Sequence, residues 1–272
     1  MPSTPEDPLA YLGFQLIAPS APLRPYVRSY WSFRREAPLL AYHEEYMHPR
    51  GGFGIVFNFG DRLFLDGQAL VEPVFLDGTN TISRKMGFLG RVELMGISFW
   101  EGEAYPFLTV PLVELRDETP LLDVLESPSL MYLYERLYAV HSLPARIELL
   151  EQWLIGRLLL RKERDPLVRA SLAWLRQVEG RLSIAALAEK FAIGQRQLER
   201  LYQTQVGLSP KQYAQLLRIQ TARLALKQMR AHSTTDLAVD LGFYDQAHFI
   251  REFKAVVGMT PYSYLKRSQE RK

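Results

Sequence analysis

The chain has 272 residues with a formal net charge of +3, and it contains no cysteine. Its length suffices for one large domain or two of ordinary size. The lack of cysteine excludes disulfide bonds, thiolate metal sites and cysteine nucleophiles, and it fits a reducing cytoplasm. The N-terminus has no basic segment that leads into an apolar one, and no apolar run approaches the roughly 20 residues that span a bilayer. The sequence therefore predicts neither a signal peptide nor a membrane helix, and we expect a cytoplasmic protein.

The first part of the chain, which we expect to form one domain over residues 1–118, consists of short apolar runs bounded by Gly, Pro and Asp. The clearest runs are GFGIVFNFG (52–60), DRLFLDG (61–67), PVFLDG (73–78) and ELMGISFW (93–100). Strands at such short spacing predict an antiparallel sheet or a small barrel. A helix or two is expected before them, near residues 22–31.

Helical spacing of apolar residues begins near Thr119 and continues to about Arg164. Residues 119–165 are therefore expected to form a helical linker or a dimerisation region. Asp165 and Pro166 then end this stretch and cap the next helix, so the third domain is placed at residues 166–272. The predicted fold class is α+β, with an N-terminal, mostly antiparallel β domain of the sensor kind, a helical linker and an all-α C-terminal domain.

The charges are distributed unevenly along the chain. Residues 166–272 carry 17 Lys and Arg against 8 Asp and Glu, a net charge of +9, whereas the other 165 residues carry 16 against 22, a net charge of −6. A basic domain joined to an acidic body is typical of a nucleic-acid-binding module attached to a part that avoids DNA. The alternative is an arginine-rich, solvated helical surface without a nucleic-acid partner.

An internal repeat indicates two similar units within residues 166–272. Eight positions recur after 51 residues: Leu198, Arg200, Tyr202, Val206, Gly207, Ser209, Pro210 and Tyr213 match Phe249, Arg251, Phe253, Val257, Gly258, Thr260, Pro261 and Tyr264. Three upstream positions recur after 50 residues: Ser183, Leu187 and Ala188 match Ser233, Leu237 and Ala238. The change of one residue predicts that the turn in the second unit is one residue longer.

Each unit has the parts of a helix-turn-helix. A serine, Ser183 or Ser233, caps a first helix, and a turn follows at Ala192 or Gly242. Glycine suits this turn because a left-handed residue ends a helix without a Cβ penalty, so Ala192 is a departure. The second helices are anchored by core residues four positions apart, namely Leu198 and Tyr202 in one unit and Phe249 and Phe253 in the other. A helix over residues 209–230, roughly 30 Å long, would join the two units.

The exposed face of the second helix of a helix-turn-helix enters the major groove. The predicted DNA contacts are Gln195, Arg196, Glu199, Arg200 and Gln203 in the first unit, and Gln246, Ala247, His248, Arg251 and Lys254 in the second. Arginine can bridge guanine O6 and N7, glutamine can pair with adenine, and glutamate can accept from cytosine N4. Several alternatives remain open. Arg200 and Arg251 could hold phosphates or form internal salt bridges, Glu199 could pair with an arginine, and His248 could be packed.

This stretch resembles the DNA-binding domain of the AraC/XylS family of bacterial transcription regulators. The resemblance runs from Arg181 to Leu265 and rests on GFYDQAHFIREF (242–253) and on the closing Gly258-Met259-Thr260-Pro261-x-x-Tyr264. It implies base-reading positions at Arg196, Glu199, Arg200, Gln246, Ala247, His248 and Arg251. The departures are Ala192, where the family usually has glycine, and Gly194, where it usually has a capping serine.

The front part is similar to the N-terminal domain of a poorly characterised subgroup of such regulators. The similarity rests on Pro25-Tyr26-Val27, Tyr30-Trp31, His48-Pro49-Arg50-Gly51-Gly52 and Gly96-Ile97-Ser98-Phe99. It implies a partner or ligand module without naming the ligand.

Two hypotheses for the N-terminal domain stay open. In the first it is a ligand sensor whose pocket is formed by Trp31, Arg50, Phe57, Arg84 and Trp100, with an arginine as the polar anchor. In the second it is an interaction module that forms a homodimer through residues 119–164, the same helices through which a ligand effect would reach the DNA-binding domain. An enzyme is disfavoured because the sequence has no Gly-rich phosphate loop, GxSxG or HExxH motif.

The sequence as a whole predicts a sequence-specific, DNA-binding transcription regulator. Its expected partners are double-stranded DNA, RNA polymerase, an unidentified small-molecule effector and a second copy of the chain. We expect no metal or cofactor, because His43 and His48, five residues apart, would point to opposite faces of a strand and lack further ligands.

Overall fold

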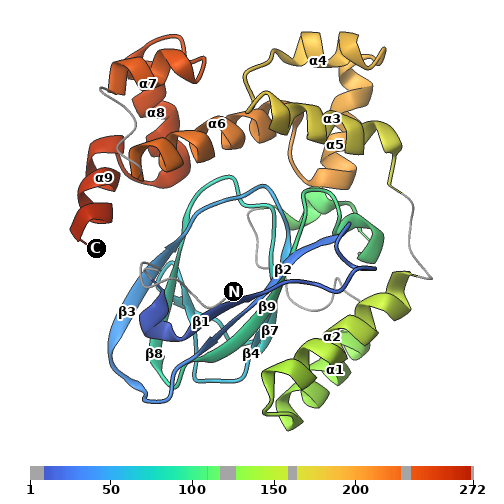
Figure 1. Ribbon diagram of the computed structural model, residues 1–272, viewed down its shortest axis with the longest axis vertical. Helices are drawn as coiled ribbons and strands as arrows, with labels where there is room; N and C mark the ends of the chain where they lie inside the picture. The colour runs from blue at the N-terminus through green and yellow to red at the C-terminus, as the bar shows by residue number, and fades with distance from the viewer. Residues whose placement is uncertain (1–8, 109, 117–126, 159–163, 228–233, 271–272) are drawn as a thin grey trace.

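The structure is a computed structural model that describes residues 9–108, 110–116, 127–158, 164–227 and 234–270. A β-rich N-terminal part lies beneath a helical C-terminal part, and two helices flank the sheets (Figure 1). This arrangement confirms the predicted α+β class. Among the described helices, none combines the length and the apolar character needed to cross a membrane.

Two antiparallel sheets form the N-terminal part. The first has the order β1 (Phe14–Ile17), β2 (Val27–Arg34), β9 (Glu93–Phe99), β4 (Gly54–Asn58) and β7 (Val74–Asp77). The second has the order β3 (Leu39–Met47), β8 (Arg84–Gly90), β5 (Phe64–Leu65) and β6 (Gln68–Ala69). Short 3-10 helices lie at η1 (Ala10–Leu12), η2 (Tyr105–Phe107) and η3 (Leu112–Leu115). The helix expected near residues 22–31 is absent there, because β2 begins at Val27 after a series of turns.

Both faces of the five-stranded sheet are buried, which explains its nearly continuous apolar runs. On the inner face Val56, Phe75 and Leu94 share a core with Met86 and Phe88 of the second sheet. On the outer face Ile55 and Phe57 share a core with α1 (Ser127–Ala139) and α2 (Leu143–Leu158). The expected linker helices are therefore packed on the sheet.

The C-terminal part is helical throughout its described length. Its helices are α3 (Pro166–Gln177), α4 (Ile184–Lys190), α5 (Gln195–Val206), α6 (Pro210–Lys227), α7 (Thr234–Asp240), α8 (Gln246–Val257) and α9 (Pro261–Glu270). Asp165 caps α3 by accepting from Leu167 N (2.9 Å), as predicted. Ser183 caps α4 by accepting from Ala186 N (3.1 Å). Ser233 and residues 228–230 of the expected connecting helix lie outside the described residues.

The two helix pairs differ by one residue in their turns, as the repeat predicted. Residues 191–194 join α4 to α5, whereas residues 241–245 join α7 to α8. Both turns contain a left-handed residue, Ala192 with φ 50° and Gly242 with φ 74°. Figure 1 shows α6 running from one helix pair to the other. The pairs are thus separate units connected by one helix.

Candidate nucleic-acid interface

The predicted contact residues of the first unit lie on one solvent-facing side of α5. Gln195, Arg196, Glu199, Arg200 and Gln203 are all exposed. Leu198 and Tyr202, on the opposite side, are completely buried. The Tyr202 hydroxyl donates to Ser171 Oγ on α3 (2.9 Å), so the buried side of α5 is also fixed by a hydrogen bond.

The charged groups on this surface of α5 are available for a ligand. Among the described residues, the side chains of Arg196, Glu199 and Arg200 take part in no hydrogen bond or ion pair. The internal salt bridges considered for Arg200 and Glu199 are therefore not formed here. Unpaired arginine and glutamate side chains at the N-terminal end of an exposed helix are chemically suited to base edges and phosphates.

The second unit presents a similar surface on α8. Gln246, Ala247, Arg251 and Lys254 are exposed, whereas Phe249 and Phe253 are completely buried. Asp245 caps α8 with a side-chain oxygen that accepts from an N-terminal amide of the helix. Gly194, at the same position before α5, has no side chain that could do so. As with Arg200, no internal partner within the described chain is found for Arg251.

His248 differs from the other predicted contacts because it is held in the turn. Its Nδ1 accepts from Tyr244 N (3.3 Å), and its Nε2 lies 3.3 Å from Glu252 Oε1. The ring also packs edge-on against Phe243, with 5.7 Å between the ring centroids. The geometry therefore favours the packed alternative, in which His248 shapes the turn that precedes α8.

Sequence reasoning missed Tyr244, which stands in this turn with 91% of its surface exposed. Its exposure next to the start of α8 makes it a candidate contact to the DNA backbone. A large aromatic residue in a turn, outside the apolar spacing of either helix, was the available indication.

Two arginines that the sequence did not single out connect the helix pairs. Arg218, in the middle of α6, donates to Gly180 O (3.0 Å), and its Nη2 lies 3.7 Å from Glu252 Oε2 on α8. Arg181 donates to Asp240 O at the end of α7 (3.1 Å). These contacts fix the second unit to the loop before α4, and so they set the relative orientation of the two exposed helix faces.

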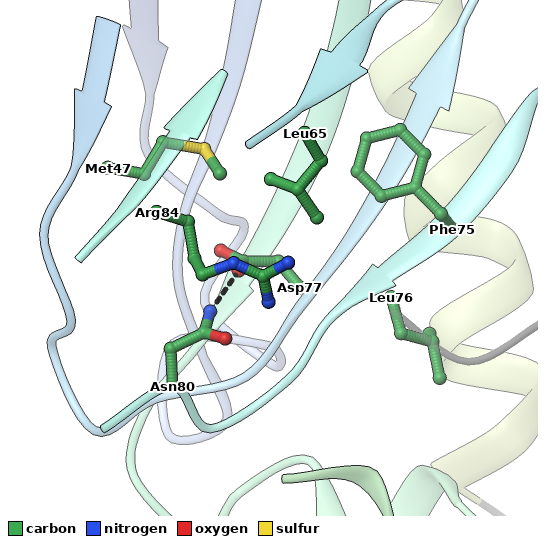
Figure 2. A pocket seen from close by; sticks show the side chains of 7 residues that line it. All are labelled: Met47, Leu65, Phe75, Leu76, Asp77, Asn80 and Arg84. Carbon is green, nitrogen blue, oxygen red and sulfur yellow. Dashed lines mark hydrogen bonds between the residues drawn. The ribbon is translucent and has the colours of Figure 1, made fainter. Parts of the chain in front are cut away.

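The five residues expected to form a ligand pocket do not lie together. Trp31 lines a cavity between the sheets, and Arg84 lines a smaller hollow beside it (Figure 2). Phe57 points to the outer core because it alternates with Val56, which lines the cavity. Arg50 is exposed after β3, and Trp100 is exposed with its ring under the Arg28 guanidinium.

The fold and these surfaces define the class of the molecule. Two helix pairs, each with an exposed polar face on its second helix, are joined by one helix in a basic domain, an arrangement suited to DNA binding. Residues 187–267 match the family described as a helix-turn-helix domain, and residues 15–120 match a domain of unknown function, DUF6597.

Relatives are similar over the C-terminal part. An uncharacterized HTH-type transcriptional regulator of Haemophilus influenzae is 31% identical over 97 residues, which are 36% of this chain and 32% of the relative. The HTH-type transcriptional activator RhaS of Escherichia coli is 36% identical over 91 residues, 33% of this chain and 32% of RhaS. These matches thus span about a third of each relative. The C-terminal part of this chain is thus similar to helix-turn-helix domains of transcription regulators.

Solved structures similar to this chain include two regulators. An AraC-type transcriptional regulator from Chromobacterium violaceum is 26% identical, covers 38% of this chain and 92% of its own, and has a TM-score of 0.35. ToxT from Vibrio cholerae is 13% identical, covers 88% of this chain and 98% of its own, and has a TM-score of 0.47.

Proposed function

We propose that this protein is a sequence-specific transcription regulator that reads two successive major grooves with α5 and α8. The observation that carries the proposal is the pair of exposed faces, each with an arginine, Arg200 or Arg251, that has no internal partner within the described chain. The 18 residues of α6 span roughly 27 Å at about 1.5 Å per residue. This length approaches one turn of DNA, about 34 Å, so both faces can meet one side of a duplex.

The N-terminal domain is proposed to modulate this reading. It contacts the DNA-binding domain directly through the buried Glu101, whose Oε2 lies 2.7 Å from Arg176 Nη1 on α3 and whose Oε1 contacts Arg28. Nearby, Glu103 Oε1 lies 2.7 Å from Arg164 Nη2. We call Arg28, Glu101, Glu103, Arg164 and Arg176 the ionic junction.

A second contact reaches the other helix pair. Ser83 N and Ser83 Oγ both donate to Val256 O near the end of α8, at 2.7 and 2.9 Å. Gln220 of α6 donates to Pro49 O (3.3 Å). The N-terminal domain thus touches elements next to both reading helices, which supports direct coupling in addition to the route through the α1 and α2 region expected from the sequence.

As a regulator the protein would act on the chromosome in the cytoplasm, with double-stranded DNA and RNA polymerase as partners. The test is selection of DNA sequences by the full chain at about 0.15 M salt, where exposed charges are screened over roughly 8 Å. Two half-sites about one helical turn apart are expected. Arg196→Ala should relax the preference in one half-site and Arg251→Ala in the other, each by roughly 1–3 kcal/mol.

The matched control is Arg62→Ala, which removes an exposed arginine from the N-terminal domain and should leave the preference unchanged. Binding that shows no sequence preference and weakens equally in all three variants would contradict the proposal, because the basic domain would then act only as an electrostatic anchor.

A further inference from the structure

Four cationic side chains gather around His48, where the end of β3 meets the DNA-binding domain. Arg50 follows β3, Arg223 and Lys227 lie on α6, and Arg267 lies on α9. We call these four residues the basic cluster. Burial, and then the charges of the basic cluster, lower the pKa of His48 to about 3. All the charges that act on this histidine are therefore positive.

Two tyrosine rings hold the arginines of α6 and α9 close to His48. The histidine stacks on Tyr46 with 6.0 Å between ring centroids, and it meets Tyr264 of α9 edge-on at 5.6 Å. The Arg267 guanidinium lies 4.4 Å from the centroid of the Tyr46 ring. The Arg223 guanidinium lies 5.5 Å from the centroid of the Tyr264 ring, and its Nε donates to the Tyr264 hydroxyl (3.3 Å). Aromatic faces attract these cations without neutralising their charge.

Within the described chain, no side chain of the basic cluster forms an ion pair with a carboxylate. In the ionic junction, by contrast, both carboxylates have arginine partners. Asp77 does act on Arg50 and favours its charged form, but burial, Arg28 and Arg223 together outweigh this effect and lower the pKa of Arg50. Like charges held close together oppose the docking of the domains, and a bound anion would relieve that repulsion.

The position of the basic cluster favours a small anion over a DNA duplex. Arg50 and Lys227 are exposed and Arg223 is half-buried, so an anion can approach from solvent. Gln220, Arg223 and Lys227 lie three and four residues apart and therefore share one face of α6. This face contacts the N-terminal domain, since Gln220 donates to Pro49 O (3.3 Å). A duplex bound to the exposed faces of α5 and α8 would not meet a face that the N-terminal domain covers.

We propose that the basic cluster binds the phosphate group of a small molecule, held between Arg50 of the N-terminal domain and the cations of α6 and α9. Arginine donates pairs of N–H bonds that match phosphate oxygens, and a phosphate dianion compensates more of the four positive charges than a carboxylate does. The assignment rests on the proposed function, since the ligand would be the effector of the regulator. Arg50, expected from the sequence as the polar anchor of a ligand pocket, would serve as an anchor at this site instead.

The basic cluster is connected to the second reading helix by two sets of contacts. Tyr264 packs edge-on against Phe253 of α8, with 5.7 Å between ring centroids. His48 Nδ1 lies 2.7 Å from Ser83 Oγ, which donates to Val256 O of α8. Since the cluster is assembled from both domains, a ligand bound to it would favour the docked arrangement and the position of α8 that goes with it.

The test uses inorganic phosphate and acetate as probes of the full chain, at a mildly alkaline pH where phosphate is mostly a dianion and at equal ionic strength set with chloride. Titration calorimetry should show phosphate binding at least about tenfold more tightly than acetate. Arg223→Gln and Lys227→Gln should each weaken phosphate binding by about three- to tenfold. Lys211→Gln removes an exposed lysine at the other end of α6 and should leave phosphate binding unchanged.

Lys227→Gln is the decisive variant if Arg223→Gln does not fold. The Lys227 side chain is exposed and forms no hydrogen bond or ion pair within the described chain, so its loss removes a charge without disturbing the packing. Unchanged phosphate affinity of Lys227→Gln, acetate binding as tight as phosphate binding, or no phosphate binding at all would overturn the assignment.

Selection of DNA sequences by the same proteins separates this assignment from the proposed function. Phosphate binding by a chain that shows no sequence preference would reject the regulator and keep the phosphate site. Sequence-specific DNA binding without phosphate binding would reject only the site. Weaker DNA binding with a smaller salt dependence in Lys227→Gln, in the absence of phosphate binding, would overturn the assignment by making the basic cluster a contact to the DNA backbone.

Discussion

Asp77 is a residue whose burial destabilises the ligand-free protein. Its pKa of about 6 exceeds the ordinary value of 3.8, so between these pH values the folded state holds a proton that the unfolded chain releases. The resulting stability is full below about pH 4 and is lost as the pH rises through about 6. Arg84 and Arg50 face this carboxylate and limit the loss, whereas Glu45 lines the same cavity.

The Asp77→Asn variant should therefore be more stable than the natural protein at neutral pH, by roughly 1–3 kcal/mol. Near pH 4 the difference should nearly disappear, since both side chains are then neutral. Urea unfolding of the ligand-free chain at both pH values measures the two differences. A constant difference at both pH values would mean that Asp77 is not the titrating group.

Protonation of His48 has the opposite effect on the pH dependence of folding stability. Burial, followed by the charges of Arg223, Lys227, Arg267 and Arg50, lowers its pKa from 6.5 to about 3. The folded state therefore stays neutral while the unfolded chain takes up a proton, so this contribution to stability is present above pH 6.5 and is lost as the pH falls toward 3.

His48→Gln should remove the loss of folding stability at low pH, because glutamine can still form a hydrogen bond with Ser83 but does not titrate. Thermal unfolding at a series of pH values below 6.5 should show a shallower decline for the variant. His141→Gln, at an exposed histidine, is the matched control and should decline like the natural protein. Parallel curves for all three proteins would exclude His48 as the source of the acid sensitivity.

At the scale of elements, the turn and cap of the first helix pair are weaker than those of the second. Gly194 caps α5 without a side-chain hydrogen bond, and a Cβ placed on it would meet nothing within 4 Å. Its φ of −66° suits any residue. Asp245 shows the alternative, since its Oδ1 accepts from His248 N (2.6 Å) at the start of α8.

Gly194→Ser should stabilise the protein by about 0.5–1 kcal/mol, because the hydroxyl can accept an N-terminal amide and the unfolded chain loses freedom. Gly242→Ser should instead destabilise the protein by roughly 1–2 kcal/mol, because φ at this position is 74° and a side chain is strained there. The urea midpoints of the two variants show which substitution stabilises the protein and which destabilises it. Stabilisation by both changes would show that backbone conformation does not govern these turns.

The helix pairs were predictable from sequence because their determinants are local. The repeat placed the cap at Ser183 and the extra residue in the second turn, and the Asp165-Pro166 pair placed the cap of α3. The contacts of Arg218 could not be predicted from sequence. They join Gly180 to Glu252, which are 72 residues apart in the chain. Alternation along β4 indicated that Val56 and Phe57 face opposite sides, but it could not tell which side faces a cavity and which faces α1 and α2.

At the scale of the whole molecule, the ionic junction is the most strongly buried polar contact between the N-terminal and DNA-binding domains that we describe. Glu101 is 3% exposed and compensates Arg28 on one side and Arg176 on the other. Removing its charge leaves two arginines facing each other across a neutral amide. Removing one partner of such a pair is destabilising, because Arg28, which is 21% exposed, would lose its counter-ion while it is still partly desolvated.

Glu101→Gln should therefore weaken the docking of the domains by roughly 2 kcal/mol. This variant should still bind the selected DNA, because the exposed faces of α5 and α8 are unchanged.

Urea unfolding of the natural protein and of Glu101→Gln measures the loss of stability. Glu114→Gln, at an exposed position in η3, is the matched control and should keep the natural stability. Unchanged stability of Glu101→Gln would show that the ionic junction does not hold the domains together, and the contact of Ser83 with α8 would then have to account for their docking.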